Sequence, residues 1–245
     1  IRDVNPRASP AIFADEGTAV TSSVSAFWSY DQRNDPVEPT GGFQLTAGQD
    51  LAGLGGDMFY SRTTASARTW AGLLDDQVVA SIEVEGGAIF GFGEDTRITD
   101  RFFLGGDRFR GFSNDGIGPR DTSVFDSGTG QFRDDALGGN YFAVLRTDVS
   151  FPLGLPEELG VYGGVFADVG TLWSLDRTRF LDTTNADGVN RVLNIDDGLK
   201  IRASAGVSLF LDTAFGPLRF NFAYPLVYED EDDREYFRFT VGSRF

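Results

Sequence analysis

Arg110 is the residue of this chain whose chemistry is most restrictive. It stands in the run Phe109-Arg110-Gly111-Phe112. A guanidinium carries five N–H donors in a planar fork and stays charged at any relevant pH, so a loop that places it inside a protein needs a carboxylate opposite. Gly111 permits the backbone to turn close to a wall, and Phe112 can plug against that wall. The run therefore requires carboxylates that face it from another part of the chain.

A second pattern suggests catalysis by paired carboxylates. Phe125-Asp-Ser-Gly-Thr129 is similar to the catalytic turn of an aspartic protease, and Asp168-Val-Gly-Thr171 could be a degenerate second copy. The two aspartates are only 42 residues apart (168 − 126), too close for a protease that carries one on each lobe. Residues 130 to 135 are also too polar for the buried strand that such a turn needs. We therefore expect no catalytic residue in either segment.

The composition excludes several other functions. The 245 residues include no histidine and no cysteine, which removes Ser-His and Cys-His nucleophiles, disulfides and the commonest metal ligands. The net charge is −16 and Lys200 is the only lysine, which disfavours binding to nucleic acid. No apolar run approaches the roughly 20 residues of a membrane helix. We expect a protein that is not an enzyme, with no cofactor and no metal site.

Alternation of apolar and polar residues predicts an all-β chain. The expected strands are nine, at residues 18–30, 42–52, 57–70, 77–91, 140–152, 160–172, 199–212, 216–226 and 235–245. Residues 57–70 give the weakest pattern, because Tyr60, Arg62, Arg68 and Trp70 share one face.

The last predicted strand, 235–245, alternates without a break and stops on an aromatic residue, which is how outer-membrane β-barrels end. Its apolar residues point one way and its polar residues the other, because side chains alternate across a strand. In a membrane barrel the apolar row faces lipid and the polar row faces a wet lumen. The apolar row is Phe237, Phe239, Val241 and Phe245, and the polar row is Arg238, Thr240, Gly242 and Arg244.

The same parity identifies two carboxylates for Arg110. In strand 140–152 the apolar residues take the lipid face, which leaves Asp148 pointing inward. In strand 160–172 the same argument leaves Asp168 inward. Alternatively, both could be ordinary lumen charges that balance Arg146 and Arg202.

The connections alternate in length. Those at 71–76, 153–159 and 213–215 are short, whereas 92–139 and 173–198 are long and 227–234 is intermediate. In an up-and-down meander every second connection lies on one side, so the long ones gather at one rim, with a tight turn at 52–56 as the exception. We expect the long loops to be extracellular and the C-terminus periplasmic. The run Glu229-Asp-Glu-Asp-Asp-Arg-Glu235 is predicted to be a solvated hairpin tip without a site.

Several motifs together resemble the BamA-like family of outer-membrane protein assembly factors. They are Phe109-Arg-Gly-Phe112, Gly116-Ile-Gly-Pro, Leu137-Gly-Gly-Asn140, Gly216-Pro-Leu-Arg-Phe-Asn-Phe-Ala-Tyr-Pro-Leu226 and the closing strand, and they follow the family's order over nearly the whole chain. The first position of the loop motif is Phe109, where an aliphatic residue is usual. Barrels of the translocation and assembly module (TamA-like) and two-partner secretion pores share the loop motif but are less similar over the final two strands.

The resemblance implies a fold and a set of site residues. The fold would be an antiparallel up-and-down transmembrane β-barrel, with residues 1–245 forming the C-terminal nine strands of sixteen. The periplasmic repeat (POTRA) domains and the first seven strands would lie outside this sequence. Within the barrel, the loop 92–139 would be folded back inside, and its arginine would pair with acidic residues at the positions of Asp148 and Asp168.

The resemblance also implies a non-catalytic function, the insertion of β-barrel proteins into the bacterial outer membrane. The closing strand, with Phe237, Phe239, Val241, Gly242 and Phe245, would offer its edge to incoming strands by β-augmentation. Partners would be unfolded outer-membrane protein clients, membrane lipid and, through the periplasmic domains, accessory lipoproteins of the BAM complex. The alternatives are a TamA-like translocation barrel and a passive outer-membrane pore. Whether residues 105–121 lie inside or outside the lumen would distinguish an assembly factor from a passive barrel.

Overall fold

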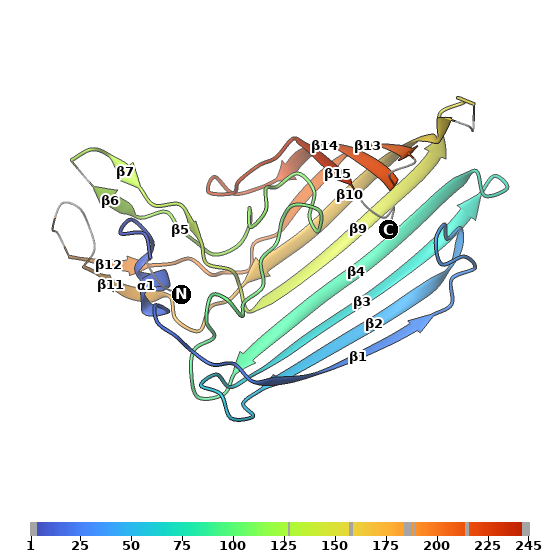
Figure 1. Ribbon diagram of the computed structural model, residues 1–245. Helices are drawn as coiled ribbons and strands as arrows, with labels where there is room; N and C mark the ends of the chain where they lie inside the picture. Colours follow the sequence, from blue (N-terminus) through green and yellow to red (C-terminus); the bar gives the residue numbers. More distant parts are fainter. Residues whose placement is uncertain are drawn as a thin grey trace.

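Nine long strands form one antiparallel sheet in the computed structural model, which describes residues 4–126, 128–156, 159–183, 188, 190–213 and 216–241 (Figure 1). Each strand lies beside its predecessor and its successor in the sheet, as in an up-and-down meander. In sheet order they are β1 (Ser23–Asp31), β2 (Gly41–Ala52), β3 (Tyr60–Leu73), β4 (Val78–Gly91), β9 (Tyr141–Pro152), β10 (Val161–Trp173), β13 (Arg202–Thr213), β14 (Gly216–Val227) and β15 (Phe237–Val241).

Every strand predicted from alternation coincides with one strand of this sheet. The bounds differ most at the ends of the chain. The first strand begins at Ser23, because residues 18–22 run beside the sheet without entering the ladder. The last strand extends from Phe237 to Val241, and the predicted residues Gly242 and Phe245 lie outside the described part of the chain.

The long connections gather at one end of the sheet (Figure 1). The connection after β4 carries β5 (Arg120–Asp121), β6 (Val124–Asp126), β7 (Gln131–Phe132) and β8 (Asp135–Ala136), and the connection after β10 carries β11 (Arg179–Asp182) and β12 (Arg191–Asn194). The N-terminal segment lies at the same end with the short helix α1 (Pro10–Ala14). No helix among the described residues is both long and apolar enough to cross a membrane.

The two faces of the sheet differ in what covers them. Large apolar side chains on one face are exposed, among them Val165, Val207 and Phe222. The other face packs against the connection after β4 and holds the buried apolar cluster. This arrangement explains the weak pattern of β3, since Tyr60 and Trp70 are buried on the covered face, and the Arg62 guanidinium lies 4.5 Å from the centre of the Phe102 ring.

Candidate functional site

The connection from residue 92 to residue 140 folds back onto the covered face of the sheet. Five of its apolar residues are buried there in one cluster with apolar residues of β4, β9 and β10. The loop supplies Phe102, Leu104, Phe109, Phe112 and Ile117, and the wall supplies Ile89, Phe142, Val144 and Leu172. Two bridges, Phe102 to Gly139 and Leu104 to Ile117, tie the loop to itself. The loop is therefore a packed part of the fold, and it delivers Arg110 to the wall.

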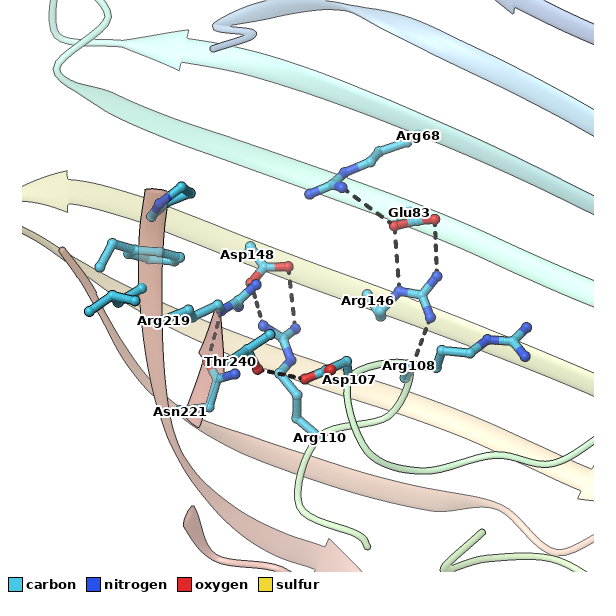
Figure 2. A pocket seen from close by; sticks show the side chains of 13 residues that line it. Arg68, Glu83, Asp107, Arg108, Arg110, Arg146, Asp148, Arg219, Asn221 and Thr240 are labelled. Atoms are coloured by element: carbon cyan, nitrogen blue, oxygen red, sulfur yellow. Dashed lines mark hydrogen bonds and ion pairs between the residues drawn. The ribbon is translucent and has the colours of Figure 1, made fainter. Parts of the chain in front are cut away.

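Arg110 lies against two carboxylates from neighbouring strands, Asp168 on β10 and Asp148 on β9 (Figure 2). Its Nε donates to Oδ2 of Asp168 over 2.8 Å, and its backbone N–H donates to the same oxygen over 3.1 Å. Its Nη1 and Nη2 donate to the two oxygens of Asp148. The side chains of Arg110 and Asp168 are 4% and 0% exposed, so this ion pair is excluded from water, while Asp148 is 25% exposed.

The residues beside Arg110 hold its backbone close to the sheet. Gly111 has a φ of 92°, and a Cβ at this position would lie 2.9 Å from the Cβ of Ser204 on β13. The Ser204 hydroxyl donates to the carbonyl oxygen of Arg110. The rings of Phe109 and Phe112 stack with centroids 5.1 Å apart. Only a glycine permits both the close approach and the left-handed backbone here.

Other charges of the covered face form their own pairs. Arg146 pairs with Glu83 and Glu85 on β4, and Arg202 pairs with Asp232. Asp148 and Asp168 therefore do not balance Arg146 and Arg202, which was the alternative left open by the sequence. Asp148 also accepts a bond from a second arginine, from Nη2 of Arg219 on β14 over 3.0 Å. Beside these groups lies a cavity of about 370 Å³, lined partly by Arg68, Arg110 and Arg219 (Figure 2).

The closing strand β15 lies at the edge of the sheet and pairs with β14. The Ala223 N–H donates to the Tyr236 carbonyl over 3.0 Å. Since residues of antiparallel strands alternate between hydrogen-bonded and non-bonded pairs, Arg238 and Thr240 direct their backbone groups to β14. Phe237, Phe239 and Val241 then direct theirs to the open edge, and their side chains are exposed on the outer face.

The acidic run 229–235 is only partly a solvated tip, because Asp230, Asp233 and Arg234 are exposed whereas other residues of the run form ion pairs; this corrects part of the prediction from sequence. Asp232 is buried and pairs with the equally buried Arg202 over 3.0 Å. Lys200 lies within ion-pair distance of Glu229, Glu231 and Asp196. Lys200 and Arg202 stand close together at the start of β13, which is a weak sign of these pairs, but no periodic pattern relates them to a run thirty residues later.

The charges around Lys200 perturb one another outside the sheet. A backbone hydrogen bond from Gly198 lowers the pKa of Asp196, and a bond from Lys200 lowers it further. Burial raises the pKa of Glu231, but the bond from Lys200, a backbone hydrogen bond and the charges of Lys200 and Arg202 together lower it below its usual value. Burial likewise opposes the charge of Lys200, yet its bonds to the three carboxylates raise its pKa. Asp196, Glu231 and Lys200 are therefore charged near neutral pH.

The segments that suggested an aspartic protease have structural roles. The carboxylate of Asp126 caps its own turn, accepting from the Gly128 N–H over 2.9 Å and from the Thr129 hydroxyl over 2.8 Å. Asp168 is occupied by Arg110. Across the described residues, no group of three or more acidic side chains has the arrangement of a metal site.

Comparison with known proteins agrees with this architecture. The whole chain, residues 1–245, matches the model of the Omp85 superfamily domain. The chain is 32% identical to the outer membrane protein assembly factor BamA of Neorickettsia risticii over 246 residues, which is 100% of this chain and 30% of that protein. It is 26% identical to BamA of Neisseria meningitidis, over 89% of this chain and 28% of that protein.

A human relative and a solved structure are also similar. The human sorting and assembly machinery component 50 homolog is 32% identical over 162 residues, 65% of this chain and 32% of that protein. The crystal structure of BamA from Haemophilus ducreyi lacking POTRA domains 1–3 superposes with a TM-score of 0.72 at 25% identity, over 90% of this chain and 42% of that one. The chain thus spans about 30% of the length of the curated bacterial relatives, at 30% and 28%.

Proposed function

This chain belongs to the Omp85 superfamily, and from that membership we propose that it is the barrel portion of a factor that inserts β-barrel proteins into the bacterial outer membrane. Relatives described as outer-membrane assembly factors support the proposal. No chemical step is required, because the driving interaction is strand pairing. The clients are unfolded outer-membrane proteins, and accessory lipoproteins of a BAM complex bind through periplasmic domains of the full-length protein.

One observation carries the proposal, the pairing edge of β15. Phe237, Phe239 and Val241 direct backbone N–H and C=O groups away from β14, where no strand of the described residues pairs with them. An edge of this kind is a template for another strand. A client strand that pairs here satisfies these groups, and exposed apolar side chains on the same strand hold the edge within lipid. The edge therefore binds a client strand through backbone hydrogen bonds, which depend little on the amino-acid sequence of the client.

The loop motif gives this edge a rigid support. Arg110 is held by Asp168 and Asp148, so the loop fills part of the space that a passive pore would leave open. The long connections at one end of the sheet support an orientation with those loops outside the cell and the short turns in the periplasm.

The test places a photoreactive amino acid at single positions of the full-length protein in vesicles that assemble a client barrel. Crosslinks to the client are expected at Phe239 and Val241 and not at Val207, an exposed apolar position on β13 in the middle of the sheet. Client crosslinks spread over the wall but absent from 237–241 during active assembly would favour a passive barrel.

A further inference from the structure

The closing strand β15 pairs within the sheet with β14, from Phe237 to Val241. Contacts from outside the sheet also reach this strand and the residues that lead into it.

The inserted loop supplies such contacts through its backbone. The Ser113 N–H donates to the Asp233 carbonyl and the Asp233 N–H donates to the Gly116 carbonyl, each over 2.9 Å. The Glu235 N–H donates to the Gly111 carbonyl over 3.0 Å, and Phe112 forms an antiparallel bridge with Arg234. The residues that lead into β15 are thus paired, as a short ladder, with the segment that follows Arg110.

A side-chain contact continues this attachment along β15 itself. The Thr240 hydroxyl donates to Oδ1 of Asp107 over 2.9 Å (Figure 2). Two residues earlier, the Arg238 guanidinium lies against Gly106, where an added Cβ would come within 3.3 Å of its Cζ. Both side chains are on the inner, lumen-facing side of β15, opposite to its exposed aromatic residues.

The opposite end of the loop is fixed to the wall. Arg110 is joined to Asp168 on β10, and the sheet order from there is β13, β14, β15. The loop therefore crosses from β10 to β15 over the inner face of two intervening strands. We propose that it braces the closing strand, with Asp107 and Thr240 as positioning residues that set the edge presented to a client. This inference rests on the proposed function of that edge.

The test removes the side-chain contact and follows the edge by hydrogen–deuterium exchange in the full-length protein. Asp107→Ala and Thr240→Val should each speed exchange in residues 235–241 by about threefold to fivefold, the effect of losing one hydrogen bond. The double variant should exchange no faster than either single variant, since both remove the same bond. Asp107→Asn and Thr240→Ser keep an acceptor and a hydroxyl, and should restore the slow exchange.

A matched control lies on the same face away from the loop. Thr46→Val removes a hydroxyl pair with Ser66, 2.7 Å apart between β2 and β3, and should leave exchange in 235–241 unchanged. Client crosslinking at Val241 should fall in the Asp107→Ala and Thr240→Val variants alone. If the variants rank in the same order in client crosslinking and in exchange rate, the result supports the brace.

Two other results separate this inference from the function on which it rests. If clients crosslink to β15 equally in all variants and its exchange is unchanged, the brace is wrong and the pairing edge stands. If exchange responds as expected but clients never crosslink to 237–241, the brace stands and the pairing edge is wrong.

Discussion

Asp168 accepts three hydrogen bonds from one residue, Arg110, through its backbone N–H, its Nε and its Nη2. The same guanidinium lies 3.8 Å from the centre of the Phe166 ring, two residues before Asp168 on β10. A planar fork is needed to satisfy these contacts together with Asp148, and a point charge is not equivalent. The pair fixes both the depth and the rotation of the loop.

Arg110→Ala should destabilise the folded barrel by roughly 3 to 5 kcal/mol, because Asp168 would remain buried without its counter-charge. Trypsin or chymotrypsin should then cut within residues 113–135 of the full-length protein. Arg110→Lys is the matched control and should recover only part of the protection, since an ammonium cannot bridge both carboxylates. Unchanged digestion together with unchanged client assembly would remove the loop from the mechanism.

The two carboxylates should not be equivalent. Asp168→Asn is expected to cost roughly 1 to 3 kcal/mol, because Asp168 is fully buried and its charge faces Arg110 directly. Asp148→Asn should lower the free energy of unfolding by about 1 kcal/mol or less, because the Asp148 side chain is partly exposed and water can solvate the arginine that faces it. Urea unfolding of the two variants measures the difference. Equal losses would mean that burial of the pair does not determine its contribution.

Gly111→Ala should lower stability and displace Arg110 from Asp168. The new methyl group would lie 2.9 Å from the Cβ of Ser204, in addition to the strain of a left-handed alanine. Gly130→Ala is the control, since Gly130 also has a positive φ but nothing within 4 Å of the added Cβ. The control should lose only about 1 to 2 kcal/mol. Similar thermal stabilities would show that the approach to β13 is not tight.

The strands and their inner faces followed from the sequence because alternation is a local, repeated signal. Once the face of one residue in a strand is known, the faces of its neighbours follow. Asp148 and Asp168 were therefore predicted to point inward from the apolar residues close to them in the chain. The closing strand was found in the same way. Contacts between distant loops carry no such period.

The brace shows what that limit means. Asp107 and Thr240 are separated by 133 residues, and their contact depends on how the loop crosses the sheet. Alternation places Thr240 in the polar row of its strand but does not indicate a partner for it. The pairing of Asp232 with Arg202 was missed for a similar reason, because six acids within seven residues suggest solvent exposure when their partners are not known.

The Lys200 cluster should make the attachment of residues 228–236 depend on pH. The pKa values of Asp196 and Glu231 are lowered, so their contribution is present above the unfolded pKa, near 4, and is lost as pH falls through the folded values. The pKa of Lys200 is raised, so its contribution is complete below its unfolded pKa and is lost only in strong alkali. Protection of 228–236 from exchange should fall below about pH 4.

The variant Lys200→Gln distinguishes the acid dependence caused by the Lys200 cluster from acid dependence caused by other carboxylates. The variant should exchange faster in 228–236 already at pH 7 and should lose part of the acid dependence, whereas Lys200→Arg should behave like the parent chain. Acid dependence of equal size in the parent and in Lys200→Gln would assign the effect to other carboxylates.

Proline at two adjacent positions of β15 distinguishes the pairing edge from the ladder to β14. Thr240 directs its N–H toward β14, so Thr240→Pro should loosen the closing hairpin itself and raise exchange in β14. Val241 directs its N–H to the open edge, where proline is tolerated by the fold, so Val241→Pro should leave the barrel intact. Client assembly by Val241→Pro should still fall about tenfold, because the edge has lost a donor that an incoming strand needs. Val241→Ala controls for the lost side chain and should assemble clients several times faster than Val241→Pro. A Val241→Pro protein that folds and assembles clients as fast as Val241→Ala would show that backbone pairing at this edge is not how clients are received.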